Sequence, residues 1–143
     1  MRIPKAVPVV LRGSQDALDI LVFAHPEAGT QIVKGTVEPG ESVDEAASRE
    51  LFEEAGISGA TCARDLGTWE QCPTGQVWYF REMLVSQALP DSWEHSTTDD
   101  GGHRFVFSWL PLGAPAPGTC HPVFVGALAF VCRQVAAQSA QQT

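Results

Sequence analysis

Residues 35–57, GTVEPGESVDEAASRELFEEAGI, are the stretch of sequence from which the fold is most directly argued. Ser42 followed three residues later by Glu45 forms a capping box, in which each side chain bonds the backbone N–H of the other residue. Residues 43–55 are rich in Ala, Glu and Leu, which favour a helix, and Gly56 supplies a left-handed stop. The sequence therefore predicts a helix over residues 43–55.

Three acids share one sector of this predicted helix. Glu50, Glu53 and Glu54 stand at positions i, i+3 and i+4, so their side chains are neighbours and repel one another. Such a row is either a solvated face or a site for a hard cation, because magnesium prefers oxygen ligands and often lies between a few carboxylates and substrate phosphates. Arg49, four residues before Glu53, can pair with a carboxylate and hold it in position.

The loop before the helix narrows the choice between these two interpretations. Residues 35–41 form a glycine-containing loop that can bring backbone close to a ligand, and they place Glu41 just before the helix. A sequence that contains both the loop and the acidic helix at this fixed spacing arises by chance less often than a sequence with either feature alone.

The same stretch resembles the Nudix box, whose pattern is G-x5-E-x7-R-E-U-x-E-E-x-G-U with U a bulky aliphatic residue. Every specified position is filled: Gly35, Glu41, Arg49, Glu50, Leu51, Glu53, Glu54, Gly56 and Ile57. The resemblance implies an α/β fold of the Nudix type, an α/β/α sandwich in which helices pack against a mixed sheet. It also implies a hydrolase that cleaves a phosphoanhydride bond of a nucleoside diphosphate linked to another moiety. That class includes nucleoside triphosphates, dinucleoside polyphosphates and ADP-ribose-like nucleotide sugars.

The resemblance assigns roles by position. The implied metal ligands are Glu50, Glu53, Glu54 and the backbone carbonyl of Lys34, with Mg2+ as the cofactor and Mn2+ as a substitute. Arg49 would orient a carboxylate, and Glu41 would lie near the metal cluster. Glu53 and Glu54, together with Arg49 and Glu41, are therefore the expected catalytic residues. A Nudix-fold module that binds a nucleotide without cleaving it is the alternative, but such a module would be expected to lose acids that this chain keeps.

The general base and the substrate contacts are less sharply indicated. An acid in the loop 91–102 is one source of a base, and the candidates there are Glu94, Asp99 and Asp100, each of which could also be an ordinary loop residue. Lys34 could touch phosphate, Gly35 could admit a close approach, and Trp78 is among the aromatic residues that could stack on a base. The alternative interpretations are that Lys34 is a solvent-exposed surface lysine and that Trp78 is buried in the core.

The flanking sequence predicts the remainder of one domain covering residues 1–143. Strands are expected over residues 5–12, 19–25, 66–70, 77–85 and 103–110, and a second helix over residues 123–137. The tail 138–143 is expected to fray.

Composition limits the partners. The formal charge is 9 − 17 = −8 and no long basic run is present, so no stable nucleic-acid complex is expected and a cation would have to bridge the protein to a phosphorylated small molecule. The four cysteines lack metal-finger spacing, and no secretory signal is visible. The apolar run 123–132 is about half the length of a membrane span. We therefore expect a cytoplasmic protein without a membrane partner, as a monomer or homodimer with reduced thiols.

Overall fold

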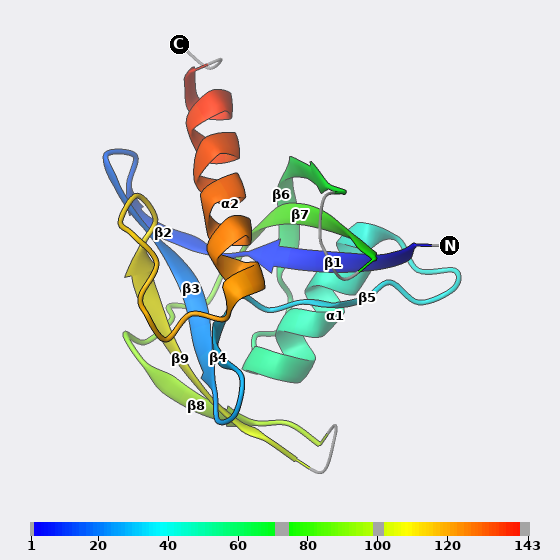
Figure 1. The fold of residues 1–143 in the computed structure, drawn as a ribbon. Helices are drawn as coiled ribbons and strands as arrows, with labels where there is room; N and C mark the ends of the chain where they lie inside the picture. The colour runs from blue at the N-terminus through cyan, green and yellow to red at the C-terminus, as the bar shows by residue number, and fades with distance from the viewer. Residues whose placement is uncertain (1, 71–74, 99–101, 141–143) are drawn as a thin grey trace.

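The computed structural model describes residues 2–70, 75–98 and 102–140 of the chain (Figure 1). Within these residues the strands are β1 (Ile3–Val9), β2 (Leu11–Ser14), β3 (Ala17–His25), β4 (Gly29–Gln31), β5 (Gly35–Thr36), β6 (Thr61–Trp69), β7 (Gln76–Leu84), β8 (Trp93–Ser96) and β9 (Arg104–Pro111). The helices are α1 (Val43–Ala55) and α2 (Pro122–Ala140).

The strands form two sheets. The first has the order β5-β1-β7-β6, with β1 and β7 parallel and the other pairs antiparallel, so it is mixed. The second has the order β2-β3-β9-β8, is antiparallel throughout, and carries β4 beside β3. The predicted α/β sandwich with a mixed sheet is confirmed, but a second sheet is added. The cause is that the predicted strand 5–12 divides at Val10, where the chain passes from the first sheet to the second.

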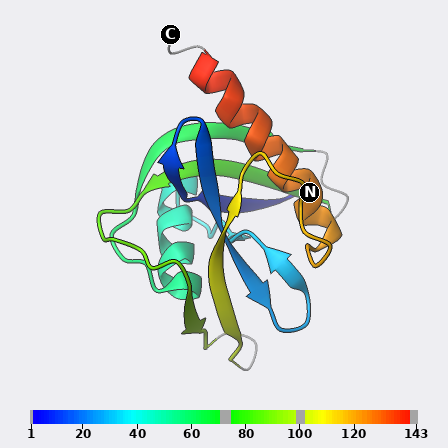
Figure 2. The same cartoon turned by 90° about the vertical axis from the view of Figure 1, so that its left-hand side faces the viewer.

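The two helices cover opposite faces of the first sheet, as the views in Figures 1 and 2 agree. Each helix has its own apolar core, and consecutive residues of β3 point alternately into the two cores. Ile20 and Val22 join the cluster under α2, whereas Leu21 and Phe23 join the cluster under α1. The acidic edge of α1 is thereby held on a layer of well-packed side chains.

The predicted first helix is confirmed at both ends. Ser42 Oγ accepts a hydrogen bond from the backbone N–H of Glu45 at 3.0 Å, and Glu45 Oε1 accepts one from the N–H of Ser42 at 3.0 Å. Gly56 closes the helix in the left-handed conformation with φ 75°. These local signals set the positions of the acids along the helix before any tertiary contact is made.

Two other predictions need correction. The expected loop 91–102 contains β8, which pairs with β9 and lies against α1. The second helix is longer than predicted and continues to Ala140, while residues 141–143 lie outside the described part; fraying of the tail stays a prediction. Gln138 Nε2 donates to the backbone carbonyl of Asp65 at 2.8 Å, and this contact ties the last turns of α2 to the sheet.

α2 is also the one helix among the described residues that is long and apolar enough, by length and composition, to cross a membrane. A core helix satisfies the same criterion, and α2 buries Phe124, Ala127, Val131 and Val135. The expected absence of a membrane partner stays a prediction.

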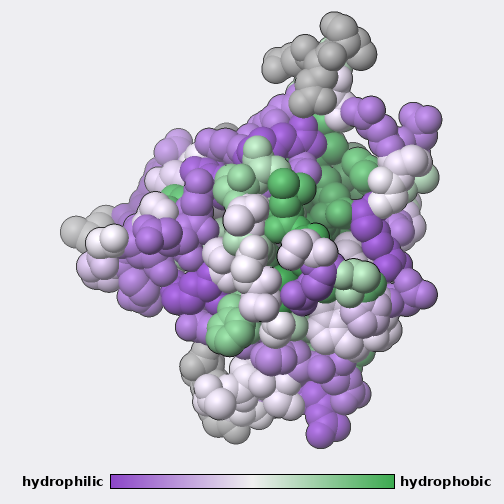
Figure 3. Space-filling view, turned by 180° about the vertical axis from the view of Figure 1, so that it is seen from behind, coloured by the Kyte–Doolittle hydropathy of each residue, from purple (hydrophilic) through white to green (hydrophobic). Residues whose placement is uncertain are grey.

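On the face opposite to that of Figure 1, apolar side chains gather beneath the C-terminal end between hydrophilic flanks (Figure 3).

The cysteine thiols that the structure describes are free, as expected: Cys62, Cys120 and Cys132. Burial raises the pKa of the Cys120 thiol, which keeps it protonated. Cys72 lies outside the described residues.

Candidate active site

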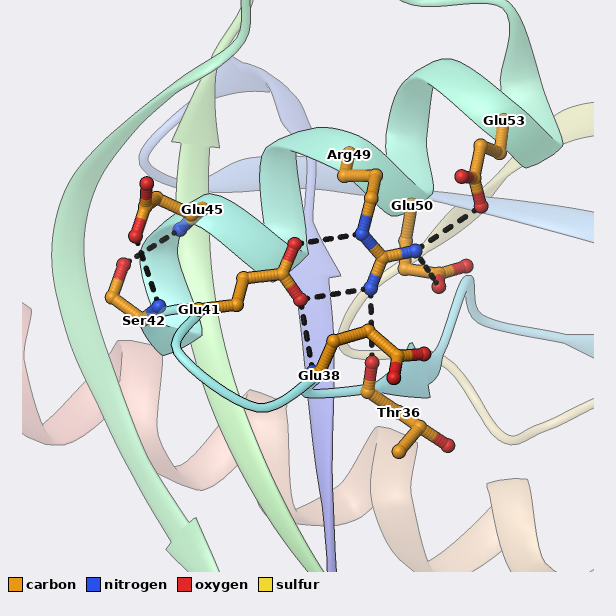
Figure 4. A network of polar contacts seen from close by, with 8 residues as sticks. All are labelled: Thr36, Glu38, Glu41, Ser42, Glu45, Arg49, Glu50 and Glu53. Atoms are coloured by element: carbon orange, nitrogen blue, oxygen red, sulfur yellow. Dashed lines mark hydrogen bonds and ion pairs between the residues drawn. The ribbon is translucent and has the colours of Figure 1, made fainter.

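Arg49 anchors the loop before α1 to the helix (Figure 4). Its Nε donates to Glu41 Oε2 at 2.7 Å and its Nη2 donates to Glu41 Oε1 at 3.0 Å, which is a two-pronged pairing. Nη2 also donates to the backbone carbonyl of Thr36 at 2.9 Å. The hydrogen bond from Arg49, followed by one from the backbone N–H of Glu38, lowers the pKa of Glu41 to about 2. Glu41 is therefore ionised at neutral pH and fixes the arginine.

The remaining terminal nitrogen of Arg49 contacts two of the three acids predicted as metal ligands. Nη1 donates to Glu50 Oε1 at 2.7 Å and to Glu53 Oε2 at 3.2 Å. Glu50 is only 8% exposed, whereas the Glu53 side chain is 42% exposed. The contacts with Glu41 first, and then with Glu50, raise the pKa of Arg49 above its usual value. The predicted orienting role of Arg49 thus has a direct geometric basis.

Gly35 is required by the closeness of Glu50. A Cβ added to Gly35 would overlap the carboxyl group of Glu50, although the backbone of Gly35 is not in the left-handed region. The first glycine of the stretch therefore allows β5 to approach the buried carboxylate.

The third acid, Glu54, borders a different hollow from the one that Glu53 lines. It lines a hollow of about 190 Å³ between α1, β3, β4 and the β8–β9 hairpin, and its Oε2 is almost inaccessible to solvent. The other residues lining this hollow are Phe23, His25, Gln31, Thr97, His103 and Phe105. We call it the histidine hollow.

Two imidazole rings, tilted by 47° to each other, line the histidine hollow. The ring centroids of His25 and His103 are 4.8 Å apart, and both rings pack on Phe105. His25 Nδ1 accepts hydrogen bonds from the backbone N–H groups of Glu27 and Ala28, each at 3.0 Å. Because Nδ1 is an acceptor in both bonds, the neutral ring carries its proton on Nε2.

A second hollow, of about 540 Å³, lies beside Glu53. It is lined by Phe52, Glu53, Gly56, His95, Ser96, Thr97 and Thr98. Its volume lies in the range of pockets that hold small ligands. The two hollows share Thr97 in their lining, and each is bordered by one of the acids of α1.

The donor chemistry suits a magnesium ion. Among residues 2–70, 75–98 and 102–140, no three His, Cys, Asp or Glu side chains are grouped as a ready metal cage. Magnesium commonly takes one or two protein carboxylates and completes its shell with water and phosphate oxygens. Glu50 Oε1 and Glu53 Oε2, which converge on one nitrogen, form a donor pair of that kind. Convergence of all three acids on one cation stays a prediction.

Two predicted roles do not fit the placement of their residues. Trp78 is 0% exposed in the core under α2, with its indole N–H bonded to Gln76 Oε1 at 2.8 Å, so it offers no face for stacking a base. Glu94 lies on β8 between Trp93 and His95, whose side chains bond carbonyls of α1. Alternation along the strand therefore points Glu94 away from the acids, and a general-base role does not fit this placement.

The remaining predicted residues have mixed outcomes. Lys34 places its ammonium 4.7 Å from the centroid of the Trp78 ring and 5.8 Å from that of Phe124, on the α2 side of β5. Its phosphate contact and its carbonyl ligand stay predictions. Asp99 and Asp100 lie outside the described residues. His25 was not predicted, because its pairing with His103 joins β3 to β9 and leaves no local signal.

The structure combines a capped acidic helix, a mixed sheet and an arginine that holds the helix carboxylates. Comparison with known proteins identifies the class to which this combination belongs. A model of the NUDIX domain matches residues 2–122. The chain belongs to the Nudix family of hydrolases.

The known proteins that resemble this chain are named for different activities. An RNA pyrophosphohydrolase from Erwinia tasmaniensis is 29% identical over 100 residues, covering 57% of this chain and 57% of that protein, so the chain spans little more than half of this relative's length. An ADP-ribose pyrophosphatase from Streptococcus suis matches with a TM-score of 0.67 at 12% identity, over 93% and 91% of the two chains. An Ap4A hydrolase from C. elegans matches with a TM-score of 0.60 at 18% identity, over 100% of both chains. At these identities the solved structures show the fold alone.

Proposed function

We propose that the chain is a metal-dependent pyrophosphohydrolase that cleaves a phosphoanhydride bond of a nucleoside diphosphate linked to another moiety. The observation that carries the proposal is the pair of carboxylates, Glu50 and Glu53, that converge on one point beside Gly35. Burial of a carboxylate is costly unless positive charge balances it. Arg49 supplies that charge here, and it gathers oxygens of both carboxylates at a position that suits a cation.

The proposed cofactor is Mg2+, with Mn2+ as a substitute. A divalent ion would supply neutralisation of phosphate charge and activation of water for attack on phosphorus. Glu50 and Glu53 would hold it, and Arg49 and Glu41 keep the donor pair and the preceding loop in register. A protein with a net charge of −8 needs such a cation to bind a polyphosphate at all.

The chain's own residues would orient the substrate through the two hollows. The hollow beside Glu53 has room for a nucleoside moiety, whereas the histidine hollow offers the Nε2–H of His25, the amide of Gln31 and the hydroxyl of Thr97 to an oxygen-rich group. The substrate would then lie across the second half of α1, with its diphosphate over the acids. Among the predicted bases, Asp99 and Asp100 stay candidates.

The proposed substrates form one panel for assay. We propose nucleoside triphosphates, dinucleoside polyphosphates and ADP-ribose-like nucleotide sugars as one panel, and the name of the RNA pyrophosphohydrolase relatives adds an RNA. The negative charge of the protein disfavours extensive contacts with an RNA backbone. We further propose a cytoplasmic protein that acts as a monomer or homodimer.

The test is release of a nucleoside monophosphate from this panel with and without magnesium. We expect turnover of at least one compound that EDTA abolishes and that falls by about a hundredfold or more in Glu53→Gln and in Glu54→Gln. Glu70→Gln is the matched control, because it makes the same chemical change on an exposed residue outside α1. Turnover that survives EDTA or both substitutions would refute the proposal. Tight nucleotide binding without any cleavage would instead identify a non-catalytic binding module.

A further inference from the structure

The nitrogens of the Arg49 guanidinium donate to two separate sets of acceptors. Its Nε and Nη2 are committed to Glu41 and to the carbonyl of Thr36, which lie on the loop side. Its Nη1 alone faces the helix carboxylates, Glu50 and Glu53. Figure 4 shows the planar group lying between the two sets of acceptors. Because the guanidinium is planar and rigid, its bonds to Glu41 and Thr36 fix the position of Nη1 as well.

The position of Nη1 is the point at which two carboxylates meet. Glu50 Oε1 lies 2.7 Å and Glu53 Oε2 3.2 Å from this nitrogen, and the side chain of Glu50 is only 11% exposed. Two carboxylates this close repel each other unless positive charge lies between them. Nη1 supplies that charge from within the chain.

We infer that Arg49 Nη1 and a divalent metal ion compete for the same oxygens of Glu50 and Glu53, so that the ion binds both carboxylates only when their hydrogen bonds to Nη1 break. Nε and Nη2 keep the guanidinium attached to Glu41 and Thr36 during the exchange, so it is the carboxylates that turn towards the ion. Arg49 is thus a positioning residue that competes with the cofactor. The inference rests on the metal-dependent function proposed above.

Competition by Arg49 predicts the direction in which metal affinity changes when the arginine is removed. If Arg49 only orients the carboxylates, its removal leaves metal binding unchanged or weakens it. If Nη1 competes for the same oxygens, removal of the guanidinium strengthens metal binding, because the ion no longer has to displace a charge-assisted hydrogen bond. The two accounts therefore predict opposite changes in affinity.

The first experiment measures Mn2+ binding by electron paramagnetic resonance and calorimetry in the absence of nucleotide. We expect Arg49→Gln to lower the dissociation constant by about fivefold or more, since a positive charge is removed from between the two ligands. The matched control is Arg81→Gln, which removes the same charge from an arginine paired with Asp44 and Asp65 at the other end of α1. This control should change the constant by less than about twofold, because solvent screens the more distant charge.

The outcomes separate the two proposals. Unchanged or weaker binding in Arg49→Gln, or equal tightening in Arg81→Gln, overturns the competition but leaves metal-dependent hydrolysis standing. No metal binding by the wild-type protein overturns both.

A second experiment needs no variant and therefore does not depend on the folding of one. Arginine side-chain NMR of the wild-type protein is recorded during titration with Mg2+. We expect the Nε–H resonance of Arg49 to persist with little shift, because its bond to Glu41 remains, while the Nη1 protons exchange faster with solvent. Binding of Mg2+ with both groups unaffected, or with both released, overturns the inference.

Discussion

At the scale of single residues, the site depends on charges that are paired at short range. The Glu50 carboxylate is tolerated in a nearly buried position because Arg49 bonds it and because Gly35 leaves room for it. Arg49 is in turn fixed by Glu41. Each side chain is thus explained by its neighbour, and a single substitution is expected to disturb several contacts.

Gly35→Ala tests the close approach. The added Cβ overlaps the Glu50 carboxyl group, so that side chain must move and the donor pair opens. We expect hydrolysis to fall by about tenfold to a hundredfold, since displacement of about 1 Å in a reacting site has effects of that order. Gly113→Ala is the control, because a Cβ there meets nothing within 4 Å. Equal activity of Gly35→Ala and wild type would show that Glu50 is not held in place by this contact.

The ion pair of Glu41 has a predicted dependence on pH. Its pKa is lowered from 4.5 to about 2 in the folded protein, so the ionised group stabilises the fold above the unfolded pKa, and that contribution is lost as pH falls from about 4.5 towards 2. In urea denaturation, the loss of stability in Glu41→Gln should be constant from pH 6 to 8 and shrink below about pH 4.5. A difference that grows on acidification has the wrong sign for this account.

At the scale of elements, local signals decide what the sequence can predict. The helix over residues 43–55 was predicted to the residue because its capping box and its terminal glycine are encoded within it. β8 was missed because a four-residue polar strand has no apolar periodicity of its own and forms by pairing with β9. The burial of Trp78 was equally out of reach, since alternation gives the faces of a strand but not which face a distant helix covers.

The β8–β9 hairpin matters because it brings His103 and Thr97 to the histidine hollow. If this hollow receives part of the substrate, His103→Ala should raise KM by about three- to tenfold, as expected for loss of a hydrogen bond and a ring contact, and should change kcat less. Arg104→Ala is the matched control, because this exposed neighbour pairs with Glu94 on the other face of the hairpin. An unchanged KM in His103→Ala would remove the hollow from the substrate site.

At the scale of the whole molecule, two apolar cores support one acidic edge. The cores under α1 and α2 meet through β1 and β3, and this arrangement makes α1 a rigid platform for its carboxylates. The net charge of −8 opposes the approach of a polyphosphate. We therefore expect bound cations to balance this charge and to be required for function. The family, the fold class and the arginine network follow from residues 35–57, whereas the two hollows depend on tertiary contacts.

The most direct test of this account is the rate of phosphoanhydride hydrolysis as a function of free Mg2+ in the wild-type protein and in Glu50→Gln, with nucleotide held constant. We predict a saturable activation by Mg2+ in the wild type. In Glu50→Gln the activation should require a much higher Mg2+ concentration and reach a far lower maximum, because one of the two converging carboxylates is lost. An identical activation curve in both proteins, or full activity of the wild type without a divalent ion, would contradict the central claim.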